Sequence, residues 1–187
     1  MYCLRFFGLP LLISLCLLSC ATKPDAQTVY QNLKEGEAHF EINMDGDAFY
    51  PADSRFKGEV TVTANTLRLN LFDQYESNTI ITLDSQDLFA QRPVKRTITI
   101  DNQVAGSIMI GRVRDKAKRT GDGFLMTEGE LTIESLSDDK IVIHLTGKTG
   151  NFNTMQNRQT WKRLNGLLVY RKPTITVTGS PRASLLY

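Results

Sequence analysis

The chain has 187 residues, of which 41% are hydrophobic and 22% charged, and its formal net charge is +2. Such a composition is ordinary for a globular protein, and the length fits one domain with a substantial core. The sequence shows no low-complexity tract and no repeat of fixed period, which excludes repeat architectures.

The N-terminus combines Arg5 with an apolar run over residues 6–18. A short cationic start, an apolar stretch and a small residue at its end are typical of a secretory signal. The run is shorter than the about 20 residues that an α-helix needs to span a bilayer. No second apolar run approaches that length, so the sequence predicts export without a transmembrane helix.

The run ends in Leu17-Leu18-Ser19-Cys20, which resembles the lipobox of bacterial lipoproteins. The resemblance implies cleavage before Cys20, diacylglycerol on its sulfur and acylation of the new amine by a fatty acid such as palmitate. An ordinary cleaved signal peptide and an uncleaved anchor are the alternatives. The cysteine distribution favours lipidation. The three cysteines are Cys3, Cys16 and Cys20, so cleavage before Cys20 leaves the exported domain with one thiol, which cannot form an internal disulfide.

The predicted location is therefore the bacterial cell envelope, where lipid anchors the protein to a membrane. The outer membrane is favoured and the leaflet is left open. The predicted organisation is a lipoprotein signal peptide over residues 1–19, a lipidated cysteine and tether over 20–36, an all-β domain over 37–178 and a flexible tail over 179–187.

The tether is expected to contain a short helix that begins near Pro24-Asp25 and ends at Gly36. Beyond it, apolar and polar residues alternate, a period that indicates strands. The first strand runs to Asp45-Gly46, a pair that supplies the positive φ angles of a type I′ hairpin turn. Further strands are expected over 60–63, 67–71, 78–83, 94–100, 105–113, 124–126, 130–135, 140–146, 167–170 and 174–178, with one helical turn over 85–91.

These elements predict an all-β fold, an antiparallel β-sandwich or barrel-like meander of about ten strands with a short N-terminal tether helix. Regular short strands without βαβ spacing favour antiparallel pairing. One apolar stripe per strand predicts that one face of each strand is buried and the other solvated.

Few side chains suggest catalysis or metal binding. His39 and His144 each share a strand face with polar residues, which favours solvated histidines over a functional pair. Asp45 and Asp47 flank a glycine as in part of a calcium loop, but the longer ligand pattern of such loops is lacking, and the hairpin turn, which explains Asp45 and Gly46, is favoured. Three carboxylates on one strand face could serve glycoside hydrolysis or form a solvated edge: Glu128, Glu130 and Glu134.

Two groups of cations are candidate binding surfaces. Arg112, Arg114, Lys116 and Lys118 alternate along the chain, which would place them on one face to hold phosphate or an acidic glycan, or at a soluble loop tip. The second group is Arg158, Trp161, Lys162 and Arg163. An aromatic ring beside cations suits sugar stacking or anionic headgroups. The alternative is that Trp161 closes the end of the core with its indole N–H bonded to backbone.

Charge is distributed unevenly along the chain, and the second group lies in its most basic part. Residues 141–187 hold seven basic and no acidic side chains, whereas residues 21–64 hold four basic and eight acidic ones. Such asymmetry can mark an interaction surface. The favoured interpretation is that strands from the two ends of the chain pair, so that the charges mix on the surface.

The domain also resembles small exported lipoprotein domains of unknown function in the envelope of Gram-negative bacteria. The resemblance rests on the x-Gly-x-x-Phe hairpin at Asp45-Gly46-Asp47-Ala48-Phe49 and on Gly129-Glu130-Leu131-Thr132-Ile133. It implies no catalytic residues.

The predicted function is that of a lipid-anchored, non-catalytic β-domain without cofactor or metal. Its partners are the membrane and an envelope protein, anionic lipid or glycan, and not nucleic acid, because the protein is exported. A lipocalin-like carrier of an apolar ligand and a glycan-acting enzyme are the alternatives. A filled core would favour the binding domain, and a hollow barrel would favour the carrier.

Overall fold

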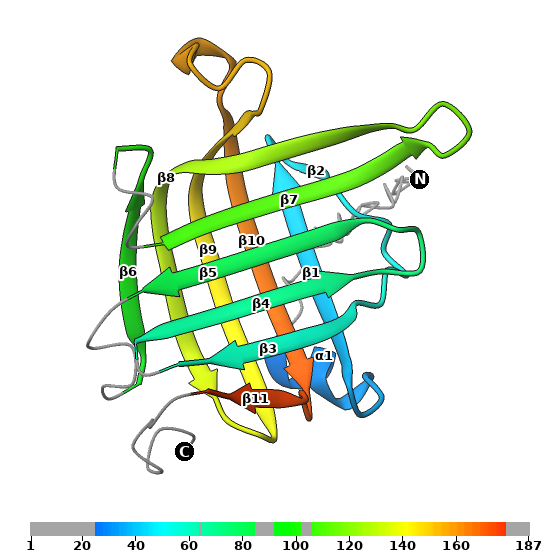
Figure 1. Ribbon diagram of the computed structural model, residues 1–187, viewed down its shortest axis with the longest axis vertical. Coiled ribbons are helices and arrows are strands. Elements are labelled where there is room, and N and C mark those ends of the chain that lie inside the picture. Colours follow the sequence, from blue (N-terminus) through cyan, green and yellow to red (C-terminus); the bar gives the residue numbers. More distant parts are fainter. Residues whose placement is uncertain (1–24, 64, 85–91, 102–105, 179–187) are drawn as a thin grey trace, which may run out of the picture.

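The computed structural model describes residues 25–63, 65–84, 92–101 and 106–178. Within these residues the chain forms eleven strands, one short α-helix and one turn of 3-10 helix (Figure 1). The predicted all-β fold is confirmed. The predicted helical turn over 85–91, Cys20 and the tail over 179–187 lie outside the described residues.

The elements follow one another in the order α1 (Ala26–Gln31), β1 (Glu37–Met44), β2 (Asp47–Ala48), β3 (Lys57–Val62), β4 (Thr66–Phe72), β5 (Asn78–Asp84), β6 (Val94–Thr99), β7 (Gly106–Asp115), β8 (Thr120–Leu136), β9 (Lys140–Asn151), η1 (Arg158–Thr160), β10 (Lys162–Arg171) and β11 (Ile175–Val177).

All eleven strands belong to one open, mostly antiparallel sheet that is folded over into two layers. The strand order is β11-β3-β4-β5-β7-β8-β9-β10-β1-β2, and β6 also pairs with β8. Figure 1 shows β3, β4, β5 and β7 crossing in front of β1, β9 and β10 at a steep angle, with β6 standing beside their ends and grouped here with β1, β9 and β10. We call these two groups the front layer and the back layer. β8 belongs to both, because its first part pairs with β7 and its second part with β6.

The bend between the layers lies where two glycines face each other. Gly129 of β8 pairs directly with Gly147 of β9. A Cβ atom at Gly129 would lie 2.1 Å from the carbonyl oxygen of Thr146, and one at Gly147 would lie 2.1 Å from that of Glu128. Only glycine therefore permits the two backbones to approach so closely at the bend.

This bend corrects the sequence-based prediction of two strands over 124–126 and 130–135. The structure has one strand of 17 residues, β8, with a register shift between Met126 and Glu128. Gly129, with a φ of 142°, continues the ladder where the sequence suggested a break. A bulge and a glycine bend this strand without ending it.

The core fills the space between the layers. Alternate residues of β1 are buried, as the period of two predicts: Ala38, Phe40, Ile42 and Met44. Aromatic rings contact one another edge-on at one end of this core, with Tyr50 and Phe56 separated by 5.0 Å between centroids and Phe49 and Phe124 by 5.6 Å. The interior is thus packed with side chains from both layers.

Hydrogen bonds join the two ends of the folded sheet. Ala38 of β1 exchanges two backbone hydrogen bonds of 2.8 Å with Phe56, the residue before β3. The hydroxyl of Tyr170 in β10 donates to the carbonyl oxygen of Gly58 in β3 at 2.9 Å. These contacts hold the front layer to the back layer on the side opposite the glycine bend.

Helix α1 covers part of the outer surface of the back layer. After it, Leu33 packs against Val142 of β9 and Val169 of β10, and all three side chains are buried. Arg171 donates to the carbonyl oxygen of Leu33 at 2.8 Å. The described part of the predicted tether therefore packs against the sheet, and β9 and β10 are buried on both faces at this point.

The predicted Asp45-Gly46 turn is confirmed, and it provides a control for a test of the bend. Asp45 and Gly46 both have positive φ, and Met44 pairs with Asp47.

Gly46→Ala should lower the free energy of unfolding by about 1 kcal/mol through backbone strain alone, because a Cβ there meets no atom within 4 Å. Gly129→Ala should cost more than about 2 kcal/mol because of its added collision with backbone. Urea denaturation of the two variants checks the order, and equal losses would contradict the proposed role of the bend.

Tyr170→Phe should lower the free energy of unfolding by about 1 kcal/mol at pH 7, because the Gly58 carbonyl loses its donor. Burial raises the pKa of Tyr170. The neutral phenol thus contributes its full stability below the unfolded pKa of about 10, and this contribution falls as the pH rises beyond it. Urea unfolding at neutral and alkaline pH should show a smaller alkaline loss for Tyr170→Phe than for the parent protein. At neutral pH the comparison is Tyr75→Phe, whose hydroxyl donates to Asp53 on the exposed surface.

Candidate functional site

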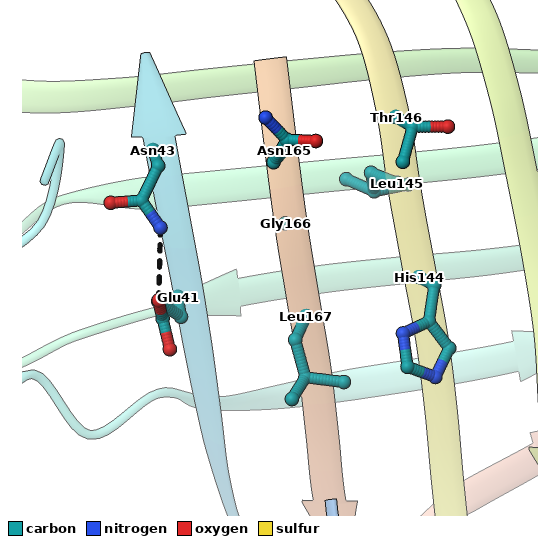
Figure 2. Close-up of a pocket in the computed structure, with 8 residues that line it drawn as sticks. All are labelled: Glu41, Asn43, His144, Leu145, Thr146, Asn165, Gly166 and Leu167. Atoms are coloured by element: carbon teal, nitrogen blue, oxygen red, sulfur yellow. Dashed lines mark hydrogen bonds between the residues drawn. The ribbon is translucent and has the colours of Figure 1, made fainter. Parts of the chain in front are cut away.

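A shallow polar cleft lies on the outer face of the back layer, above the part that α1 covers. Figure 2 shows Glu41 and Asn43 of β1, Asn165 and Leu167 of β10, and His144 and Thr146 of β9 lining it. The amide of Asn43 donates to Oε1 of Glu41 at 2.9 Å. The volume is about 170 Å³, which is small for a ligand site.

The groups of this cleft do not form an acid–base pair. Glu41 and His144 both face Leu167, which lies between them on β10. Two strand spacings, about 10 Å, therefore separate them, which is beyond hydrogen-bond reach. Nε2 of His144 instead lies 2.8 Å from Oε2 of Glu134.

The two histidines point away from the core, as predicted, but they do not meet. His39 and His144 lie on β1 and β9, with β10 between them, and their registers differ by two residues. His39 is half-buried, and burial lowers the pKa of its imidazole.

Each of the three carboxylates that could have served glycoside hydrolysis faces a cation or a histidine on the open surface. Glu128 lies 2.7 Å from Lys148, and Glu130 lies 3.2 Å from Lys95. Glu134 faces His144. The three carboxylates thus share one strand face, as the period of two predicts, and they do not oppose one another across a cleft.

Asp45 takes part in the hairpin turn and in contacts with β10. Its carboxylate accepts from the backbone N–H of Arg163 at 2.9 Å and lies 3.9 Å from the ammonium of Lys162. In the described parts of the chain, no group of three or more His, Cys, Asp or Glu side chains is arranged to hold a metal ion.

The first group of cations is neutralised by carboxylates. Arg112 and Arg114 both reach Asp122 on β8, and Nη1 of Arg112 donates to the carbonyl oxygen of Phe49 at 2.9 Å. Lys116 pairs with Glu76, and Lys118 lies 3.5 Å from Asp115. β7 ends at Asp115, so only the two arginines belong to the strand and the two lysines lie in the following turn. The predicted single face of four cations is therefore not formed.

The second group surrounds a tryptophan that is held within its own loop. The indole N–H of Trp161 donates to the carbonyl oxygen of Met155 at 2.8 Å, as the alternative interpretation expected. Arg158 lies over the indole ring at 5.4 Å, and Gly150 lies beside it. Trp161 is half-exposed and lies outside the buried core cluster. Stacking of a sugar on the face beneath Arg158 would require that side chain to move.

The charge asymmetry of the sequence largely disappears in the fold. Pairing of β1 with β10 brings the acidic N-terminal segment beside the basic C-terminal one. Lys162 faces Asp45, Lys172 pairs with Glu35, and Lys148 pairs with Glu128. Arg163 is exposed and makes no ion pair with any residue that the structure describes.

A second hollow, the front groove, lies on the outer face of the front layer. It has a volume of about 280 Å³, and its apolar lining includes Met109 and Val113 of β7 and Phe152 after β9. These side chains are 37%, 38% and 44% exposed. Exposed apolar side chains gathered along a hollow are typical of binding surfaces.

Sequence reasoning missed this groove. Met109 and Val113 occupy outward positions of β7, where the period of two predicts polar side chains. Phe152 belongs to a loop, and its position beside Gly123 depends on the pairing of β8 with β9.

No protein-family model matches the sequence, and comparison with curated proteins and with solved structures likewise found no match. Among the described residues, the one α-helix is too short to cross a membrane.

The paired arginines give a test of how the β7–β8 hairpin is held. Asp122→Asn should lower the free energy of unfolding by about 1–2 kcal/mol, because two guanidinium groups lose a carboxylate that is only 12% exposed. Glu134→Gln is the control, since this exposed partner of His144 should cost less than about 0.5 kcal/mol. Urea denaturation of both variants measures the two losses. An Asp122→Asn protein as stable as the control would show that pairing with the arginines does not hold the hairpin.

Proposed function

We propose that the chain is a lipid-anchored, non-catalytic protein of the bacterial cell envelope that binds an envelope component through its front groove. The lipid on Cys20 holds the domain at a membrane, with the outer membrane favoured. The observation that supports binding is the gathering of exposed apolar side chains in a hollow on the outer face of the front layer.

The packing of the interior supports a surface site over a carrier. Side chains of both layers, such as Phe40, Leu69 and Leu168, are fully buried between the layers. A carrier of the lipocalin type needs an interior space lined by aliphatic side chains. The filled core therefore favours a ligand that is bound outside.

The placement of the carboxylates supports a role without catalysis. Glycoside hydrolysis uses two carboxyl groups on opposite sides of the scissile bond. Glu128, Glu130 and Glu134 lie on one open face, and each faces a basic group.

The position of α1 supports a defined orientation at the membrane. Cys20 precedes Asp25 by five residues, which span at most about 18 Å when extended. A lipid on Cys20 would therefore keep the membrane close to α1, which packs on the outer face of the back layer. The front groove lies on the other outer face and stays open to the surrounding compartment.

The anchor is tested by Cys20→Ser. The variant should lose incorporation of a palmitate analogue and move from the membrane to the soluble fraction, because the thioether that holds diacylglycerol cannot form. Cys16→Ser is the matched control and should remain labelled and membrane-bound. Labelling of the Cys20→Ser variant at the parent level would refute the anchor.

The binding role is tested with the protein purified in detergent and with isolated envelopes from the cells that produce it. Retention of the protein on the envelopes should be saturable and should fall for Phe152→Ala, which removes one wall of the groove. Arg163→Glu, on the back layer, should be retained like the parent. Retention that does not saturate, or that is unchanged by Phe152→Ala, would refute the proposed site.

A further inference from the structure

The walls and floor of the front groove follow from strand register. Phe72 of β4, Asn78 of β5, Gly111 of β7 and Gly123 of β8 form one row across the outer face. Phe152 lies against Gly123, so close that a Cβ there would be 2.5 Å from its ring. Phe152 thus lines the groove beside Gly123, and Phe72, which is 49% exposed, stands at the other end of this row, three strand spacings or about 14 Å from Gly123.

The floor excludes two kinds of ligand. β5 and β7 are paired on both sides, and β8 is paired with β7 and β9 beside the groove. Their backbone groups are used in the sheet, so a peptide cannot bind here as an added strand. The groove is also shallow and open, which leaves an acyl chain mostly in water and without the gain from burying its CH₂ groups.

One polar side chain without a partner points to a ligand that forms hydrogen bonds. The side-chain amide of Asn78 lies over Gly111, 2.4 Å from where a Cβ would be, and has no hydrogen-bond partner among the described residues. An amide offers two donors and an acceptor beside the exposed ring of Phe152. An aromatic ring beside a planar amide in an open groove suits the apolar faces and hydroxyl groups of sugars.

The far end of the groove is cationic. It continues into a second hollow of about 330 Å³ along the β7–β8 hairpin, which shares Glu76, Val113 and Gly121 with the groove and is also lined by Lys116 and Arg119. Glu76 pairs with Lys116. Arg119 makes no ion pair with the rest of the described chain. A carboxylate on the ligand would supply the missing ion-pair partner of Arg119.

We propose that the front groove binds an acidic glycan, with the sugar rings over the floor beside Phe152 and Asn78 and a uronate carboxylate at Arg119. The inference rests on the proposed binding function and names its ligand class. The contribution of charge should weaken with added salt, because Arg119 and Lys116 are exposed.

Isothermal titration of the protein in detergent tests the proposal, with a short oligogalacturonate as the probe and its methyl-esterified form as the uncharged control. The acidic oligomer should bind and the ester should bind at least about fivefold more weakly, since the ester lacks the charge that meets Arg119. Phe152→Ala should weaken binding by about five- to tenfold through lost ring contact. Arg119→Glu should weaken binding of the acid by about tenfold and leave binding of the ester unchanged.

The control variant is Arg163→Glu, which makes the same charge change on the back layer and should bind the acid like the parent. Equal affinities for acid and ester, no effect of Phe152→Ala, or equal losses for Arg119→Glu and Arg163→Glu would each overturn the acidic-glycan proposal. Absence of oligogalacturonate binding would also overturn it. If saturable, Phe152-dependent retention on envelopes persists in that case, the proposed binding function stands with a different ligand.

Discussion

The contact between Gly129 and Gly147 determines how this sheet is arranged. The two residues pair directly, and neither position has room for a Cβ beside the opposing backbone. Here β8 leaves β7 and takes β6 as its partner, so that one strand contributes to both layers. Without this close approach the strands would continue in one layer, and their apolar stripes would have no second layer to pack against. The core, the closing contacts of Tyr170 and the outward faces all depend on the bend.

The local structure could be predicted from the sequence because its signals are local. The alternation from Glu37 to Met44 predicts β1 and its buried face, and Asp45-Gly46 predicts the turn after it. The continuity of β8 could not be predicted in the same way. Gly129 is compatible with either a loop or a bend, and only its pairing with Gly147 decides between them.

The candidate sites were harder to predict because side chains that are distant in sequence become neighbours. Arg112 and Arg114 suggest a free cationic face until Asp122 is placed across the hairpin. The front groove depends on residues from three strands and two loops, and part of its floor consists of glycines that carry no chemical signal of their own. Charge segregation along the chain likewise does not survive on the surface, since antiparallel pairing of β1 with β10 joins the two oppositely charged segments.

The docking of the N-terminal segment on the back layer has a mechanical consequence. In a protein that is attached at Cys20, any pull on the domain enters through the segment ahead of Asp25. The load first reaches α1 and the contact of Leu33 with Val142 and Val169, a small apolar patch that can peel away in steps. Only then does tension act along β1, whose whole length is hydrogen-bonded to β10 and would have to slip at many bonds together. The segment would thus detach at a lower force than is needed to separate β1 from β10.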